Sequence, residues 1–239
     1  MSFRPDPPYV HGTPQKTGVL LVNLGMGPIV LFLPLYAAQV FTGGIDAQGW
    51  PSVFKAKVAC PSFAFLRDGV DGTAVSGLSN INYEIPDMLV DYRVANTIVP
   101  VSYWRAPGAN QNTYIAESFF DELCVLGGKD PVEARRRMLA KTPRLLNVLN
   151  VAAEKAGWGT KLPAGRFRGV AVGSNSGSFC AMVAEVSVQK QVVRVHRVVC
   201  AIDCGMTVNP DTIAAQLEGA DAGGSNNQPD VRDGFCRTG

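Results

Sequence analysis

Residues 99–111 read Val-Pro-Val-Ser-Tyr-Trp-Arg-Ala-Pro-Gly-Ala-Asn-Gln, and they lead directly into an apolar, acidic pattern from Tyr114 to Leu123. The segment combines a strand-like run, a turn that contains Arg, Pro and Gly, and a helical period. Such an order presents backbone N–H groups to an anionic ligand at the start of a helix. The sequence therefore predicts a cofactor-binding loop at this point.

A second unit of the same kind lies about a hundred residues further on. Residues 195–205 read Val-His-Arg-Val-Val-Cys-Ala-Ile-Asp-Cys-Gly, and an Asn-Pro pair and the segment Gln216-Leu217-Glu218-Gly219-Ala220 follow. Asp203 with Gly205 is typical of a turn, and Asn209 before Pro210 is typical of a helix cap. For these two polar residues the pattern favours structural roles over ligand contacts.

Length and composition fit a globular protein of one large or two small domains. The chain has 239 residues, of which 46% are hydrophobic and 18% are charged, and its net charge is +2. Lys and Arg are dispersed except for Arg135, Arg136 and Arg137, which we expect on the solvated face of a helix. We therefore expect no nucleic-acid partner.

The chain has only two histidines, so the sequence predicts no histidine-rich metal site. Six cysteines are scattered without a CxxC pair, so most are expected to be reduced core residues. Cys200 and Cys204 are the only close pair in the sequence, and a disulfide or metal there is the alternative to plain burial. His196 stands in a strand pattern and is expected to be a hydrogen-bonded structural residue.

The element pattern predicts an α+β fold with mostly antiparallel strands and three to four helices. A hairpin is expected over residues 44–58, and Gly-rich loops follow it. Helices are expected over 115–126, 131–140 and 143–156, and a last one from Asn209 to Glu218. Other strands are expected over 17–25, 88–94, 169–173, 181–188 and 192–202.

No charged side chain occurs between Lys16 and Asp46, and this run, residues 17–45, is long enough to span a bilayer. Glycine and proline interrupt the run, which favours a buried strand at its front instead. The N-terminal region also lacks a convincing secretory signal. The cytoplasm is the favoured compartment, with membrane or periplasmic association as the alternative.

The two units together resemble the molybdopterin-binding large subunit of the xanthine dehydrogenase and aldehyde oxidase family, in particular the isoquinoline 1-oxidoreductase β-subunit type. The resemblance covers residues 41–220. Residues 104–111 match a family loop of the form aromatic-Arg-Gly-Phe-Gly-Gly-Pro-Gln, and the helix that contains Glu117 continues the match. Glu185 and the segment from Asp203 to Gly219 fit the second family motif.

This resemblance implies a molybdopterin cofactor and a small iron–sulfur partner subunit. The family reaction is hydroxylation of an aldehyde or N-heterocycle, with water as the source of oxygen. The cofactor-binding positions that the resemblance implies are Trp104, Arg105, Ala106, Gly108, Gln111, Gln216 and Gly219. A pterin carries a phosphate and many hydrogen-bonding edges, which suits glycine-rich loops and helix starts.

Departures from the family pattern lower the expected activity. Ala106 and Pro107 replace the usual Gly and Phe, so the aromatic residue that holds a flat substrate is missing there. The family's catalytic glutamate lies downstream of the point at which the match ends, Ala220, so no catalytic residue is assigned. We expect a family fragment that is inactive alone; a non-catalytic remnant or subunit-interaction domain is the alternative.

Three regions are expected on this basis. Residues 1–40 form an N-terminal arm, expected to be unstructured over residues 1–16, and an apolar segment of foreign character. Residues 41–220 form a partial molybdopterin-binding domain, and residues 221–239 a loose tail. Residues 7–25 are similar to the N-terminus of ferrochelatases, and a ferrochelatase-like function is the third possibility. The chain departs from that pattern at Met26.

Overall fold

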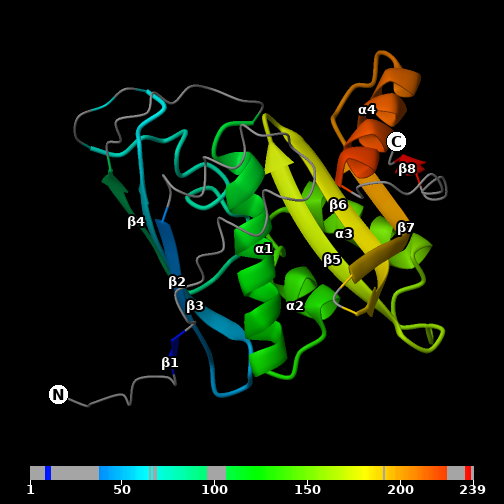
Figure 1. Ribbon diagram of the computed structural model, residues 1–239, viewed down its shortest axis with the longest axis horizontal. Coiled ribbons are helices and arrows are strands. Elements are labelled where there is room, and N and C mark those ends of the chain that lie inside the picture. The colour runs from blue at the N-terminus through cyan, green and yellow to red at the C-terminus, as the bar shows by residue number, and fades with distance from the viewer. Residues whose placement is uncertain are drawn as a thin grey trace. The chain divides into compact units, whose positions relative to one another are not determined.

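The computed structural model describes residues 9–11, 38–64, 66, 69–95, 106–190, 192–224 and 235–237. The chain forms two compact units that divide between Met138 and Leu139. Each unit contains a four-stranded sheet (Figure 1).

The first unit is a sheet with α-helical segments that follow it in the chain. Its elements are β1 (Tyr9–His11), β2 (Ala38–Ile45), β3 (Pro51–Cys60), β4 (Asp87–Val94), α1 (Ala109–Leu126) and α2 (Pro131–Met138). The strands lie in sequence order; β1–β2 and β2–β3 are antiparallel and β3–β4 is parallel. The predicted hairpin is confirmed, and Asp46 closes its turn by accepting the amides of Gln48 and Trp50 at 2.9 and 2.8 Å.

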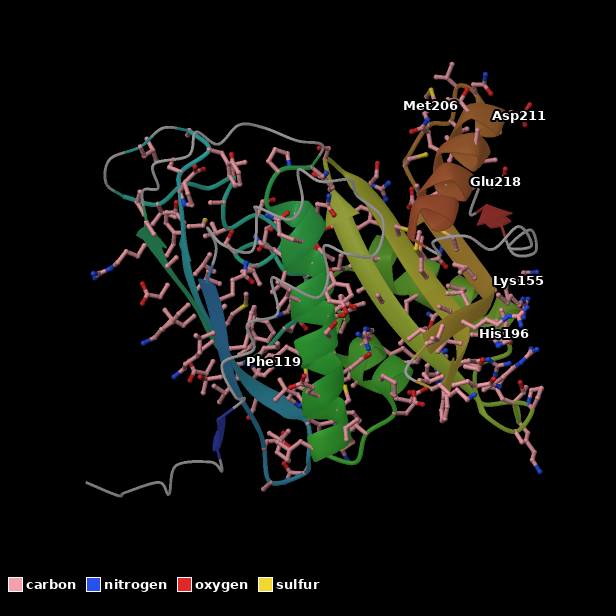
Figure 2. All side chains as sticks on the ribbon, in the orientation of Figure 1. Phe119, Lys155, His196, Met206, Asp211 and Glu218 are labelled. Atoms are coloured by element: carbon pink, nitrogen blue, oxygen red, sulfur yellow. The ribbon has the colours of Figure 1, made fainter. Side chains whose placement is uncertain are left out.

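Helix α1 packs on β2 and β3 through an aromatic cluster. Figure 2 labels Phe119 of this cluster. Its ring centroid lies 5.3 Å from that of Phe41 on β2 and 5.4 Å from that of Phe54 on β3. Gly43 permits the close approach, because a Cβ atom there would lie 2.8 Å from Leu123 Cδ2. The second half of α1 thus packs closely on the sheet of this unit.

The second unit packs a helix on an antiparallel sheet. Its elements are α3 (Pro143–Lys155), β5 (Arg166–Asn175), β6 (Ser178–Gln189), β7 (Val192–Asp203), α4 (Pro210–Gly224) and β8 (Phe235–Arg237). Strands β5, β6 and β7 pair antiparallel, and β8 pairs parallel to β7. Helix α3 contacts all three long strands, and its buried side chains Leu145, Val148, Leu149 and Ala152 are fully covered.

The four helices and the mostly antiparallel strands agree with the predicted α+β class. Two details differ from expectation. Residues 9–11, which we expected in an unstructured arm, pair with β2 and thereby satisfy backbone hydrogen bonds. Within residues 221–239, expected to be a loose tail, α4 continues to Gly224 through helix-favouring alanines, and β8 pairs with β7.

Most of residues 17–45, and so the strand expected over 17–25, lies outside the described residues; the described part, from residue 38, is strand β2. Among the helices that the structure describes, none is long and apolar enough to cross a membrane. The two units divide the range 41–220, which we expected to be one domain, at residue 138. The assignment of 41–220 as a molybdopterin-binding domain stays a prediction.

Candidate functional site

The turn before α1 carries Ala106 and Gly108, two of the residues expected to bind a cofactor. Ala106 and Gly108 have positive φ angles of 49° and 73°. The amides of three residues at the helix start donate to carbonyl oxygens of the turn at 2.9–3.0 Å: Ala109 to Pro107, Asn110 to Ala106 and Asn112 to Gly108. A ligand at this turn would therefore need donors other than these three amides.

Gly108 is required by the packing of the first unit itself. A Cβ atom at this position would lie 1.9 Å from the carbonyl oxygen of Thr73, and the positive φ angle already favours glycine. The space beside the Gly108 backbone is therefore filled by the segment 71–80. The missing side chain serves a protein contact there rather than leaving room for a ligand.

Asp71 fixes the segment that covers Gly108. Its buried carboxylate accepts hydrogen bonds from Ser62 Oγ at 2.6 Å and from the amides of Ala64, Thr73 and Ala74. Burial alone would raise the pKa of Asp71, but these hydrogen bonds outweigh it and hold the pKa below the ordinary value. The carboxylate therefore stays charged and keeps the segment ordered against α1.

Asn112, in the first turns of α1, ties the same segment to β2. Its side-chain amide donates to the carbonyl oxygens of Ala74 and Ser76 at 2.9 and 2.8 Å, so its Oδ1 must accept. Gln39 Nε2 supplies that donor at 2.8 Å. Gln39 Oε1 is then a buried acceptor that has no donor among the described residues. A group that donates a hydrogen bond would complete this network.

The other predicted cofactor residues lie in three places. Gln111 is exposed on α1, and Gln216 and Gly219 are exposed on α4, in the second unit. Trp104 and Arg105 lie outside the described residues. Their role at a cofactor stays a prediction.

The second motif has the structural roles that we expected for its polar residues. The Asp203 carboxylate accepts the amide of Gly205 at 3.0 Å and so forms the turn. The Asn209 side chain accepts the amides of Asp211 and Thr212 at 3.0 and 3.2 Å and so caps α4. Both predictions are confirmed.

Sequence reasoning missed the partner of Asp203. Arg144, in the first turn of α3, binds the carboxylate with Nε at 2.8 Å and Nη2 at 2.6 Å, and its guanidinium lies 4.7 Å from the ring centroid of Phe179. The Arg144 hydrogen bonds, followed by that of the Gly205 amide, lower the pKa of Asp203 to about 2. Asp203 thus links α3 to β7 as a carboxylate.

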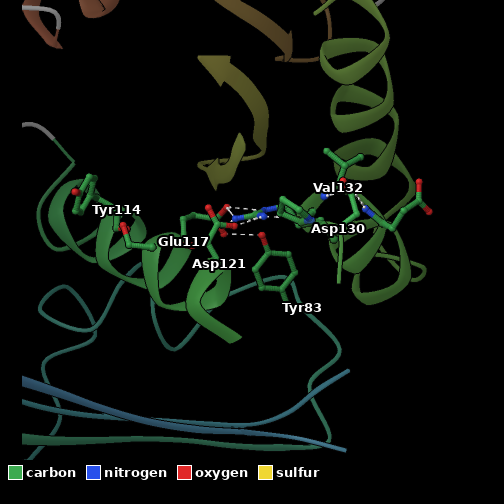
Figure 3. A network of polar contacts seen from close by, with 10 residues as sticks. Tyr83, Tyr114, Glu117, Asp121, Asp130 and Val132 are labelled. Atoms are coloured by element: carbon green, nitrogen blue, oxygen red, sulfur yellow. Dashed lines mark hydrogen bonds and ion pairs between the residues drawn. The ribbon is translucent and has the colours of Figure 1, made fainter. Parts of the chain in front are cut away.

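A buried charge cluster joins α1 and α2 in the first unit (Figure 3). The Arg135 side chain is 0% exposed, and it contacts Glu117 Oε2 at 2.9 Å and Asp121 Oδ1 at 2.6 Å. Tyr83 donates to Glu117 Oε1 at 2.6 Å, and its ring stacks on Phe120 at 4.2 Å. Burial, and then the charge of Glu117, raise the pKa of Tyr83 well above its ordinary value, so its hydroxyl remains a donor.

Our expectation that the arginine triplet lies on a solvated face is wrong for Arg135. Arg135 follows Val132 by three residues and precedes Met138 by three, and all three are buried. This helical spacing places the guanidinium on the covered face of α2, where Glu117 and Asp121 compensate its charge. The spacing is the sequence signal that could have identified it. Arg137 does lie on the exposed side, over the ring of Trp50 at 4.7 Å.

Glu185, which fits the second family motif, takes part in a buried contact in the second unit. Arg168 Nη2 and Nε contact its Oε1 at 3.0 and 3.1 Å. The same Arg168 donates to the carbonyl oxygen of Gly157 at 2.6 Å, and Arg197 donates to that of Lys155 at 3.0 Å. Two arginines from the sheet therefore bind carbonyl oxygens at the C-terminal end of α3, where cations are favoured.

His196 and the cysteines agree in part with their predicted roles. His196 Nε2 lies 2.8 Å from Ser187 Oγ, so the expected hydrogen bond is present. The cysteines at positions 60, 124, 180, 200 and 204 are present as thiols, not in disulfides. The close sulfur neighbour of Cys200 is Cys180, at 3.4 Å, rather than Cys204. Side chains on paired strands are brought together by register, which sequence spacing does not show.

In the described part of the chain, no three His, Cys, Asp or Glu side chains gather where they could hold a metal ion. The described charge clusters are ion pairs whose carboxylates have cationic partners. They can hold elements together. Near the turn before α1, Gln39 Oε1 is the buried acceptor that has no donor among the described residues, and the cofactor site expected there stays a prediction.

Comparison with known proteins brings out relatives in sequence, although no protein-family model matches. Over 153 residues the chain is 31% identical to the isoquinoline 1-oxidoreductase β-subunit of Brevundimonas diminuta. Over 212 residues it is 30% identical to a nicotinate dehydrogenase subunit of Pseudomonas putida. The similarity supports the molybdenum hydroxylase family. These matches do not support the ferrochelatase resemblance of residues 7–25.

Both matches are partial for the relatives. They take in 62% and 74% of this chain, which spans 19% and 17% of the length of these two proteins. Over most of their length, the two relatives therefore have no counterpart in this chain.

Two solved structures match part of the chain. The aldehyde oxidoreductase of Desulfovibrio gigas matches with a TM-score of 0.40 and 17% identity, over 67% of this chain and 20% of its own. Quinoline 2-oxidoreductase of Pseudomonas putida 86 matches with a TM-score of 0.41 and 16% identity, over 61% of this chain and 21% of its own.

Proposed function

We propose that this chain carries part of the large subunit of a molybdenum hydroxylase that acts on N-heterocyclic aromatic compounds. The observation that carries the proposal is the sequence similarity, which extends over 153 and 212 residues. The names of both relatives refer to such compounds, isoquinoline and nicotinate. Hydroxylation of an electron-poor ring carbon, with oxygen from water, is the corresponding reaction.

The proposed cofactor is molybdopterin, whose molybdenum supplies oxygen transfer and two-electron oxidation when it is bound. The residues proposed to hold it are Trp104, Arg105, Ala106, Gly108, Gln111, Gln216 and Gly219. Support comes from Gln39 on β2, which contacts Asn112 near the start of α1. Its Oε1 lacks a donor among the described residues, and an N–H group of a pterin edge could donate a hydrogen bond to it. Gly108 fits less well, because Thr73 already occupies the space beside it.

We further propose that a small iron–sulfur subunit is the electron-accepting partner, and that the chain alone is inactive. The short span relative to the two relatives supports the second point. The described residues contribute binding and positioning: Asn112 and Asp71 order the segment beside the cofactor turn.

The first experiment measures molybdenum and activity in the purified chain. We expect neither stoichiometric molybdenum nor isoquinoline-dependent dye reduction. The presence of both would overturn the claim that the chain is inactive alone. It would leave the family assignment intact.

The second experiment tests the family function. Residues 41–220 replace the matching segment of the Brevundimonas diminuta protein, and the chimera is produced with its small subunit. We expect bound molybdenum, and we expect Arg105→Ala in the chimera to lower the molybdenum content. A soluble, assembled chimera without molybdenum would refute the proposed role of this segment.

An interaction domain is the second candidate, and one observation favours it. Met206 and Val208, in the loop before α4, are 94% and 93% exposed, which is unusual for large apolar side chains (Figure 2 labels Met206). We expect the chain to associate at high concentration through this loop. Sedimentation of the wild type and of Met206→Ser/Val208→Ser checks this, and equal association of both proteins would refute it.

A further inference from the structure

Two cysteine thiols lie in contact on neighbouring strands of the second unit. Cys180 on β6 and Cys200 on β7 have their Sγ atoms 3.4 Å apart. Cys180 pairs in register with Ile202 and Cys200 with Met182, so the two cysteines occupy diagonal positions. Neither the family resemblance nor the proposed function uses this pair.

We propose that Cys180 and Cys200 form a reversible disulfide when the protein meets a low-molecular-weight disulfide such as glutathione disulfide. Cys180 is partly exposed, whereas Cys200 is only 3% exposed. An external disulfide therefore reaches Cys180 first, and Cys200 is placed to react second.

The exchange balances in two steps. The Cys180 thiolate attacks one sulfur of glutathione disulfide, forms a mixed disulfide and releases one glutathione. The Cys200 thiolate then attacks Cys180 Sγ, forms the intramolecular bond and releases the second glutathione. Two electrons pass from the cysteine pair to glutathione disulfide, and the two thiol protons end on the released glutathiones.

The diagonal placement indicates that this disulfide is labile. Diagonal positions on antiparallel strands are commonly about 7–8 Å apart. Disulfides usually join Cα atoms about 4.4–6.8 Å apart. Closing the bond therefore requires β6 and β7 to move slightly, and a strained disulfide is easily reduced again.

Two of the other described cysteines, Cys60 and Cys124, are poor competitors. Burial raises the pKa of Cys60 to about 11 and that of Cys124 to about 12, so both remain unreactive thiols. Cys204 is partly exposed, and its sulfur lies near Thr207 Oγ1, at 3.9 Å, in the turn that follows β7. Cys204→Ser is therefore a matched control for the pair.

The test treats the full chain with glutathione disulfide and counts thiols after denaturation. The wild type and Cys204→Ser should each lose two thiols, so that the wild type falls from six to four, and excess reduced glutathione should restore them. Tryptic mapping of Cys204→Ser should join peptide 169–190 to peptide 198–232. The wild-type thiol count does not depend on the folding of any variant.

Two variants test the order of the steps. Cys200→Ala should stop at a mixed disulfide between glutathione and Cys180, and Cys180→Ser should leave Cys200 as a thiol. The proposal is overturned if Cys204→Ser shows no link between the two peptides, or if the wild type retains all six thiols.

Discussion

Replacing Arg135 with methionine should remove a cation on which the α1–α2 contact of the first unit depends. The change keeps much of the side-chain volume but leaves Glu117, whose side chain is 6% exposed, without its main partner. Asp121 is 39% exposed and can regain water, so Glu117 accounts for most of the penalty. Removing one partner of a buried ion pair costs about 3–5 kcal/mol of stability. Because Asp121 is partly exposed, we expect the free energy of unfolding to fall by about 3 kcal/mol.

Arg136→Met is the matched control, one residue further along α2. Its guanidinium is 39% exposed and pairs with the exposed Glu133, so we expect a change within about 0.5 kcal/mol. Urea unfolding followed by circular dichroism gives both free energies of unfolding. Adding Glu117→Gln to Arg135→Met should recover about 1 kcal/mol, because the uncompensated charge is removed. Equal losses in Arg135→Met and Arg136→Met would refute this account of the cluster.

Two further predictions concern the second motif and the cofactor turn. Arg144→Ala should raise the pKa of Asp203 from about 2 toward 3.8 in an NMR titration of its carboxyl group. Because the folded pKa is depressed, the stabilisation by this pair is complete above the unfolded pKa and is lost as the pH falls toward 2; an unchanged pKa in the variant would contradict the assignment. Gly108→Ala should destabilise the protein by about 2 kcal/mol or more, because strain at positive φ is joined by the clash with Thr73. Gly128→Ala is the control, since Gly128 has a φ of 62° but open space around its Cβ position, and thermal unfolding should show the smaller loss there.

Periodicity and capping residues predicted the elements well because these signals are local. Asp130 accepts the amides of Val132 and Glu133 and so starts α2 at the expected place. The hairpin turn at Asp46 and the cap at Asn209 follow from the same short-range chemistry.

Long-range pairing could not be predicted in the same way. The Arg144–Asp203 contact joins residues 59 apart in sequence, and the Cys180–Cys200 contact depends on strand register. Arg135 was predicted to be exposed, because charge alone does not show that Glu117 lies opposite it. For the candidate site, the sequence indicated the turn before α1 but not that Thr73 fills the space beside Gly108.

Side-chain contacts hold helix α3 to β7 at both ends of the helix. The stretch of helix between the two contacts must therefore match the stretch of strand between them. Arg144 meets Asp203 near the start of the helix, and Arg197 meets the carbonyl oxygen of Lys155 at its end. The eleven helical steps from residue 144 to 155 span about 17 Å at about 1.5 Å each. The six strand steps from residue 197 to 203 span about 20 Å at about 3.3 Å each.

Because these two lengths are similar, the helix and the strand match in length between the two contacts. One inserted residue in α3 would also rotate the following side chains by about 100°, and one in β7 would turn them to the other face of the sheet. Insertions in either segment should therefore release one end of the helix. The hairpin turn at Lys190 lies outside the stretch between these two contacts, so it can change length without disturbing either of them.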